Sequence, residues 1–318
     1  MLLPILALLA GLILLVWSAD QFVNGAAATA RNLGMSPMLI GLTIVSFGTS
    51  APEILVSVMA ASTGAGSLAV GNALGSNIAN IAMVLGITAL IAPLPVKSGV
   101  LRKEMPLLLA ITLLAGALLF NLSLGLLDSV ILLLALIVSL YLFGRFQRNA
   151  DPGDAIAEDE DEIPEMSSGK ATLLLLVGLT VLAGSSRLLV WGATEIALSL
   201  GVSELIIGLT IVAIGTSLPE LAASVASALK KQHDIAIGNV VGSNIFNLVA
   251  VMAVPGLFGT VEFDSIVIWR DYAVMLALTV LLLLFALWQR PPSVSRYEGG
   301  ILATLYAGYL VLLYNMAI

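Results

Sequence analysis

Long apolar runs recur from one end of the chain to the other, and most are about as long as a lipid bilayer is thick. Each run is continuous, whereas a membrane β-barrel would show short segments of alternating polar and apolar residues. The pattern therefore predicts an all-α polytopic membrane protein. Its ten predicted helices lie near residues 3–30, 38–60, 69–91, 104–121, 127–145, 171–199, 205–228, 236–258, 271–289 and 299–317.

Composition supports this interpretation, because 59% of the residues are hydrophobic and only 10% are charged. A mean hydropathy of +1.08 excludes an ordinary soluble globular domain. Residues 2–17 are as apolar as a signal peptide, but no basic leader precedes them, so we expect a helix of the mature protein. Eight of the twenty acidic residues lie between Asp151 and Glu165, which predicts a solvated acidic linker at 146–170.

Forty residues of the first half return in the second half. Residues 41–80 and 208–247 align at a spacing of 167 positions without a gap, and 21 of the 40 residues are identical. Several of the identical residues are polar, although they lie within apolar sequence. In the first copy these polar residues include Thr49, Ser50, Glu53, Ser76 and Asn80. Polar groups are costly within a membrane, so their repetition indicates a pathway or a binding site.

The distribution of Lys and Arg predicts how the chain is oriented. Eleven basic residues fall in loops on one side of the membrane, and Arg270 alone falls in a loop on the other side. Loops rich in Lys and Arg stay in the cytoplasm, so we expect both termini outside the cell and the acidic linker in the cytoplasm. The expected location of the protein is the cell inner (plasma) membrane. Five helices per half is an odd number, so the repeated segments cross in opposite directions. We therefore predict two inverted five-helix repeats, 1–145 and 171–318, an arrangement typical of secondary transporters.

Each copy of the repeat places a glutamate directly after a proline. Pro52 and Pro219 have no amide hydrogen to donate within the helix, so we expect kinked or broken core helices with free backbone oxygens. Glu53 and Glu220 follow at the same depth, and these core helices carry no lysine or arginine at that depth. A cation from solution is therefore the expected counter-charge. Carboxylates, hydroxyls and carbonyls form an all-oxygen site, which suits hard cations such as calcium and does not suit zinc or copper.

A second motif, GNxxGSNxxN, follows about twenty residues later in each copy. Gly71 and Gly75, like their counterparts Gly238 and Gly242, form a small-xxx-small face that allows close helix approach. Ser76 and Asn80 are four residues apart and share one helix face, so both can point toward the kinked helix. GxxxG alone indicates packing, but its pairing with GTSxPE in both copies is a strong signal of a shared site.

GTSAPE with GNALGSNIAN, and GTSLPE with GNVVGSNIFN, resemble the two alpha-repeats of the calcium/cation antiporter superfamily. The closest resemblance is to its prokaryotic sodium/calcium exchangers, and it extends over the chain apart from the linker. The resemblance implies four core helices that hold the ions, with the first helix of each half sliding across them. It also implies calcium and sodium as transported ions and lipid as surroundings, with no cofactor, no enzymatic activity, no nucleic acid and no obligate protein partner.

The resemblance further implies a role for each motif residue. Calcium would bind Glu53 and Glu220 with the backbone oxygens of Thr49 and Thr216. One sodium site would use Glu53, Ser76, Ala213, Thr216 and Ser217. The second sodium site would use Glu220, Ser243, Ser46, Thr49 and Ser50. Asn80 and Asn247 would lie at the centre.

Asn247 occupies a position where several members of the superfamily, notably the potassium-dependent exchangers, carry aspartate. The core therefore has two formal negative charges in place of three. Two carboxylates neutralise one calcium ion, and we expect exchange that does not depend on potassium.

A second function on the same scaffold is calcium/proton antiport. Two close glutamates repel each other when no cation is bound, which favours proton binding. The serine and threonine oxygens at both sodium positions favour sodium as the counter-ion. An intramembrane enzyme and a passive channel are more remote alternatives, and the sequence contains neither a GxGD nor an HExxH motif.

Overall fold

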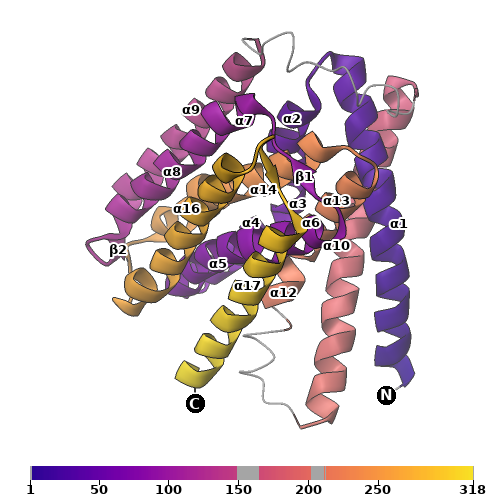
Figure 1. Ribbon diagram of the computed structural model, residues 1–318. Helices are drawn as coiled ribbons and strands as arrows, with labels where there is room; N and C mark the ends of the chain where they lie inside the picture. The colour runs from indigo at the N-terminus through magenta and orange to yellow at the C-terminus, as the bar shows by residue number, and fades with distance from the viewer. Residues whose placement is uncertain (1, 149–164, 202–210, 212, 318) are drawn as a thin grey trace.

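The computed structural model describes residues 2–148, 165–201, 211 and 213–317, and nearly all of them are helical (Figure 1). The first half comprises α1 (Leu2–Leu33), α2 (Pro37–Ile40), the π-helix η1 (Gly41–Val45), α3 (Ser46–Thr49), α4 (Ala51–Ser62), α5 (Gly66–Ala79), the π-helix η2 (Asn80–Leu85), α6 (Gly86–Ile91), β1 (Leu94–Pro95), α7 (Ser98–Arg102), α8 (Glu104–Leu119), β2 (Ser123–Leu124) and α9 (Leu126–Arg148).

The second half has a similar order of elements. It comprises α10 (Ser168–Ser199), α12 (Ala213–Thr216), α13 (Leu218–Leu229), α14 (His233–Phe246), the π-helix η5 (Asn247–Val251), α15 (Ala253–Phe258), β3 (Val261–Glu262), the π-helix η6 (Val267–Tyr272), α16 (Ala273–Trp288), β4 (Ser293–Val294) and α17 (Arg296–Ala317).

Seven helices in the described residues are long and apolar enough to cross a membrane, and the bent pair Pro37–Thr49 and Ala51–Ser62 makes an eighth if it is counted as one span. The chain is therefore an all-helical membrane protein, as predicted. Two of the ten predicted helices correspond to shorter elements, α8 with 16 residues and α13 with 12. Residues 205–210 of the predicted helix 205–228, and most of the predicted linker 146–170, lie outside the described residues.

Two helical stretches form the centre of the molecule. In the most apolar 18 residues of Gly66–Ile91 and of His233–Phe258, 78% and 83% of the residues are buried inside the protein. The corresponding share in the other spans is 17–39%. They pack with α8, α16 and parts of α9 and α17 into one large apolar core. These two stretches carry the repeated GNxxGSNxxN motifs. The motif side chains are therefore held inside protein and away from lipid.

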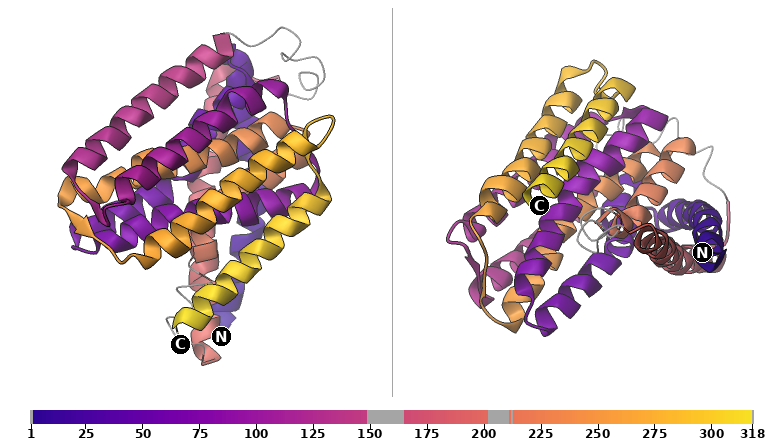
Figure 2. Two further views of the ribbon diagram at one scale, coloured as in Figure 1. Left: turned by 60° about the vertical axis from the view of Figure 1, so that its left-hand side comes forward. Right: turned by 90° about the horizontal axis from the view of Figure 1, so that it is seen from below.

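Helices α1 and α10 lie side by side at one edge of the other helices in Figure 1 and in the right view of Figure 2. Glycines allow this close contact, because a Cβ atom on Gly178 would lie 2.6 Å from the Phe22 amide nitrogen. A Cβ atom on Gly25 would similarly lie 2.8 Å from the Leu175 Cα atom. Small residues at such a crossing let two membrane helices pack backbone to backbone. The two helices thus form a tightly packed pair of their own.

Two very short antiparallel strand pairs connect the halves at the helix ends. Strand β1 pairs with β4, with Leu94 opposite Val294, and β2 pairs with β3, with Ser123 opposite Glu262. Each pair therefore joins one strand of the first half to one strand of the second half. The apolar pattern gave no indication of these strands, because each is only two residues long.

Candidate functional site

Both proline-containing helices are broken as the sequence predicts. Helix α3 ends at Thr49 and α4 starts at Ala51, and the two are bent by 43°. Ser50 at this break has φ −82° and ψ 3°, and Ser217 at the break between α12 and α13 has φ −90° and ψ 5°. Proline is favoured in the first turn of a helix, where its missing N–H is not needed. The two copies of the motif therefore produce the same local backbone.

Each break places a glutamate in the first turn of the following helix, Glu53 in α4 and Glu220 in α13. Both residues are almost fully buried, at 1% and 0% exposure. The positive end of the helix dipole and the free N–H groups of the first turn favour a negative charge there. In the described residues, none of the Lys or Arg ion pairs found in the structure involves either glutamate.

Hydroxyl groups of the first half reach polar groups of the second half at this point. Ser50 Oγ donates to Glu220 Oε1 at 3.2 Å. Thr49 Oγ1 lies 3.4 Å from Ser243 Oγ, and Ser243 Oγ is 3.5 Å from the main-chain oxygen of Ser46. The polar residues of the two repeats, far apart in sequence, therefore meet in one cluster. No backbone or side chain from solvent-exposed loops takes part in these contacts.

Several buried polar atoms of the predicted site residues have no hydrogen-bond partner among the described residues. They are Glu53 Oε2, Glu220 Oε2, Ser217 Oγ, and both side-chain polar atoms of Asn80 and of Asn247. Buried polar groups are nearly always satisfied, so a concentration of unsatisfied oxygens needs a partner. Because all but two of these atoms are oxygens, a hard cation suits the cluster. The described residues contain no group of three or more His, Cys, Asp and Glu side chains that could hold a metal.

Ten of the twelve predicted site residues are buried, with at most 5% exposure: Ser46, Thr49, Ser50, Glu53, Ser76, Asn80, Ser217, Glu220, Ser243 and Asn247. Thr216 is partly buried at the end of α12. Ala213 begins α12, and its side chain lies outside what the structure describes. Direct contacts join five of these residues, namely Ser46, Thr49, Ser50, Glu220 and Ser243.

Two residues next to the site were not predicted. Asn72 of α5 donates from Nδ2 to the main-chain oxygen of Glu53 at 3.2 Å and contacts Ser57 Oγ at 3.4 Å. Asn239 of α14 donates in the same way to the main-chain oxygen of Glu220 at 3.2 Å and to Ser224 Oγ at 2.9 Å. All four residues are identical between the two copies. The repetition was a visible signal, but the motif alone does not show which groups these amides contact.

One ion pair joins the α1–α10 pair to the central helices. Lys230 Nζ, just after α13, lies 2.6 Å from Asp20 Oδ1 of α1. Asp20 also accepts hydrogen bonds from the side chains of Gln21 and Asn24 on its own helix. Both partners are partly exposed, so the pair contributes modestly, roughly 1 kcal/mol or less. It marks a contact between α1 and the end of α13.

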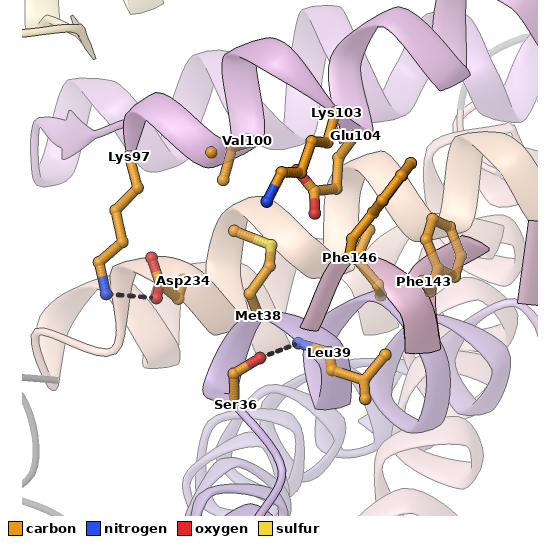
Figure 3. A pocket seen from close by; sticks show the side chains of 12 residues that line it. Ser36, Met38, Leu39, Lys97, Val100, Lys103, Glu104, Phe143, Phe146 and Asp234 are labelled. Carbon is orange, nitrogen blue, oxygen red and sulfur yellow. Dashed lines mark hydrogen bonds and ion pairs between the residues drawn. The ribbon is translucent and has the colours of Figure 1, made fainter. Parts of the chain in front are cut away.

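A cavity of about 80 Å³ lies elsewhere, among the ends of α2, α8, α9 and α14 (Figure 3). Lys97 Nζ bonds Asp234 Oδ2 across it at 2.8 Å, and Ser36 caps α2 by accepting from the Leu39 amide at 3.1 Å. Phe143 and Phe146 form its apolar wall. None of the twelve predicted site residues lines this cavity. It is therefore separate from the buried oxygen cluster.

A buried cluster of oxygen atoms between the two halves of a helical membrane protein is typical of cation transporters. Comparison with known proteins places the chain in this class. Residues 3–145 and 170–315 match the family described as sodium/calcium exchanger protein. The chain belongs to this family, within the calcium/cation antiporter superfamily.

Individual relatives cover nearly the whole chain. A candidate antiporter named CaxA, from Alkalimonas amylolytica, is 46% identical over 99% of this chain and 100% of its own length. The inner membrane protein YrbG of Escherichia coli (strain K12) is 39% identical over 99% of this chain and 98% of its own length. A solved structure of the sodium-calcium exchanger NCX_Mj, soaked with sodium and strontium, matches with a TM-score of 0.84 and 33% identity, covering 98% of both chains.

Proposed function

We propose that this protein exchanges sodium for calcium across a membrane, with both ions competing for one site built on Glu53 and Glu220. The observation that carries the proposal is a buried carboxylate from each half, each with one oxygen that has no hydrogen-bond partner, and neither paired with a Lys or Arg among the described residues. Such a pair is stable in apolar surroundings only with a bound cation or proton. The family assignment and the NCX_Mj likeness support calcium and sodium as the cations.

The twelve residues divide between the ions as follows in this proposal. Calcium binds the carboxylates of Glu53 and Glu220 and the main-chain oxygens of Thr49 and Thr216. One sodium ion uses Glu53, Ser76, Ala213, Thr216 and Ser217, and another uses Glu220, Ser243, Ser46, Thr49 and Ser50. Asn80 and Asn247 lie between them. The contacts of Ser50 with Glu220 and of Thr49 with Ser243 support the second group.

Alternating access requires that the halves be threaded in opposite directions. We propose two inverted repeats of five helices each, with both termini outside and the acidic linker in the cytoplasm. The exchange of strands between halves, β1 with β4 and β2 with β3, supports a two-fold relation. The close packing of α1 with α10 supports their movement as one unit across the core. Filling the site allows this movement, whereas an empty charged site resists crossing the apolar barrier.

The driving ion is tested by separating two gradients in proteoliposomes. We expect an outward sodium gradient at equal pH to drive calcium uptake, and a pH gradient without sodium to drive little. The reason is that hydroxyl and carbonyl oxygens suit sodium, whereas a proton needs only the carboxylates. Measuring calcium-45 uptake under each gradient decides the matter. Uptake driven by pH alone, at the rate seen with sodium, would establish calcium/proton antiport in place of this proposal.

Asn247 provides a test of the charge count. Changing Asn247→Asp adds a third carboxylate beside Glu53 and Glu220, so the calcium-loaded site passes from formally neutral to negative. We expect calcium to bind more tightly and to be released more slowly, because moving a net charge across the apolar barrier is unfavourable. Half-saturating calcium and maximal flux are measured together, and both should fall. Asn244→Asp, a buried change three residues earlier on α14, is the matched control. Unchanged flux and affinity in Asn247→Asp would contradict a central position for residue 247.

A further inference from the structure

Asn72 and Asn239 make equivalent contacts in the two halves. Each amide N–H group bonds the main-chain oxygen of the nearest glutamate, Glu53 or Glu220, at 3.2 Å. The same nitrogen also reaches the serine one helical turn further along, Ser57 or Ser224. Each asparagine is thus hydrogen-bonded to the first turn of the helix after the break, at the backbone of the glutamate.

Asn239 makes an additional contact that crosses between the halves. Its Oδ1 atom accepts a hydrogen bond from Thr49 Oγ1 at 3.1 Å. Thr49 ends α3, directly before the first break, and lies 3.4 Å from Ser243 Oγ. A single fully buried amide therefore holds the backbone at Glu220 with its nitrogen and the first-half break with its oxygen.

We infer that Asn72 and Asn239 are positioning residues of the ion site, and that Asn239 sets the spacing between the two half-sites. This inference rests on the proposed function, because the groups that it positions are those of the exchange site. Neither asparagine has its amide oxygen or nitrogen assigned to an ion. They act through the backbone of Glu53 and Glu220 and through Thr49, so that the carboxylates and hydroxyls stay close enough to share one cation.

Helix packing at this point explains why an amide is suited to the task. A Cβ atom on Gly242 of α14 would lie 2.7 Å from the Leu42 main-chain oxygen and 2.8 Å from Ser46 Cβ, so α14 lies directly against η1 and α3. At such close approach, a short side chain with one donor and one acceptor group can reach both partners. Alanine would fill less space and leave the buried Thr49 hydroxyl without this acceptor.

The test measures calcium uptake by the full chain in proteoliposomes, with calcium and sodium each titrated. In Asn72→Ala and Asn239→Ala, we expect half-saturating calcium to rise roughly fivefold for each hydrogen bond lost, and half-saturating sodium to rise as well. Maximal uptake per folded molecule should be retained. Asn77→Ala is the matched control, because Asn77 is a second α5 asparagine, buried, that donates to a main-chain oxygen, that of Asn244 at 3.1 Å. It should lower thermal stability and leave both half-saturating concentrations unchanged.

Thr49→Val tests the same contact from its other side, with nearly the same side-chain volume. Combined with Asn239→Ala, it should raise half-saturating calcium by less than the product of the two single effects, because both changes remove one shared contact. Three results would overturn the inference: unchanged half-saturation in Asn239→Ala, an equal rise in Asn77→Ala, or fully multiplicative effects in the double variant. If Asn239→Ala does not fold, Asn72→Ala against the Asn77→Ala control decides the question. Absence of calcium flux in the wild type would instead refute the proposed function.

Discussion

Replacing Glu220 by glutamine is expected to lower sodium-driven calcium uptake at least about a hundredfold. The carboxylates of Glu53 and Glu220 neutralise the two charges of a calcium ion, and both are almost completely buried. Glutamine keeps the size of the side chain and removes one charge, so calcium would remain with an uncompensated charge in apolar surroundings. Removing one partner of a buried charge pair costs about 3–5 kcal/mol, and about 2.7 kcal/mol already corresponds to a hundredfold change. Initial calcium uptake into proteoliposomes at a fixed sodium gradient is the measurement.

Glu53→Gln should give a loss of the same size, because Glu53 holds the equivalent place in the other half. Glu195→Gln is the control, since Glu195 is an exposed residue of α10 and should retain wild-type uptake. Near-normal uptake in either Glu53→Gln or Glu220→Gln would remove the central hypothesis, whichever ion drives the exchange. Loss of uptake together with loss of folded protein would be distinguished by measuring the amount and the thermal stability of each purified variant.

The helices, their two breaks and the burial of the glutamates after them were predictable because their signals are local or repeated. Apolar length indicates a membrane helix, and the predicted 69–91 and 236–258 correspond to the central stretches Gly66–Ile91 and His233–Phe258. Proline directly before a glutamate indicates a break at that point, and both breaks are present at Ser50 and Ser217. Identity between two distant copies then identified the polar residues that are buried.

What the sequence did not reveal depends on the register between distant segments. The Asn239 amide was visible in the motif, but its contact with Thr49 depends on how α14 crosses α3, and a single helix pattern does not encode that crossing. The same applies to the ion pair between Asp20 and Lys230. The two-residue strands are too short for any alternation to be detected, and they form because each finds a partner in the opposite half. The π-helical stretch η2, which begins at Asn80, also has no propensity signal of its own.

The arrangement of charge and packing explains why two half-sites are better than one. A single buried glutamate would have to be neutral or paired within its own helix. In the proposed site, two glutamates from separate halves share one divalent cation, and two like charges without that cation repel each other. In this proposal, binding of the ion is coupled to the approach of the two halves, which is the coupling that ion exchange requires. The close crossing of α14 over η1 must be preserved for this to work.

Replacing Gly238 by valine is expected to abolish both folding and transport. Gly238 of α14 faces Gly41 of η1, and a Cβ atom on Gly238 would lie 2.9 Å from the Met38 main-chain oxygen and 3.0 Å from the Gly41 Cα atom. These neighbours are backbone atoms that cannot rotate away, so the cost should reach or exceed the upper end of the roughly 1–3 kcal/mol usual for overpacking. The yield of monodisperse protein, its thermal stability and calcium uptake are measured together. Gly308→Val is the control, because Gly308 is exposed on α17 and no described atom lies within 4 Å of its Cβ position. A stable Gly238→Val protein with normal uptake would show that the halves do not need this contact to bring Glu53 and Glu220 together.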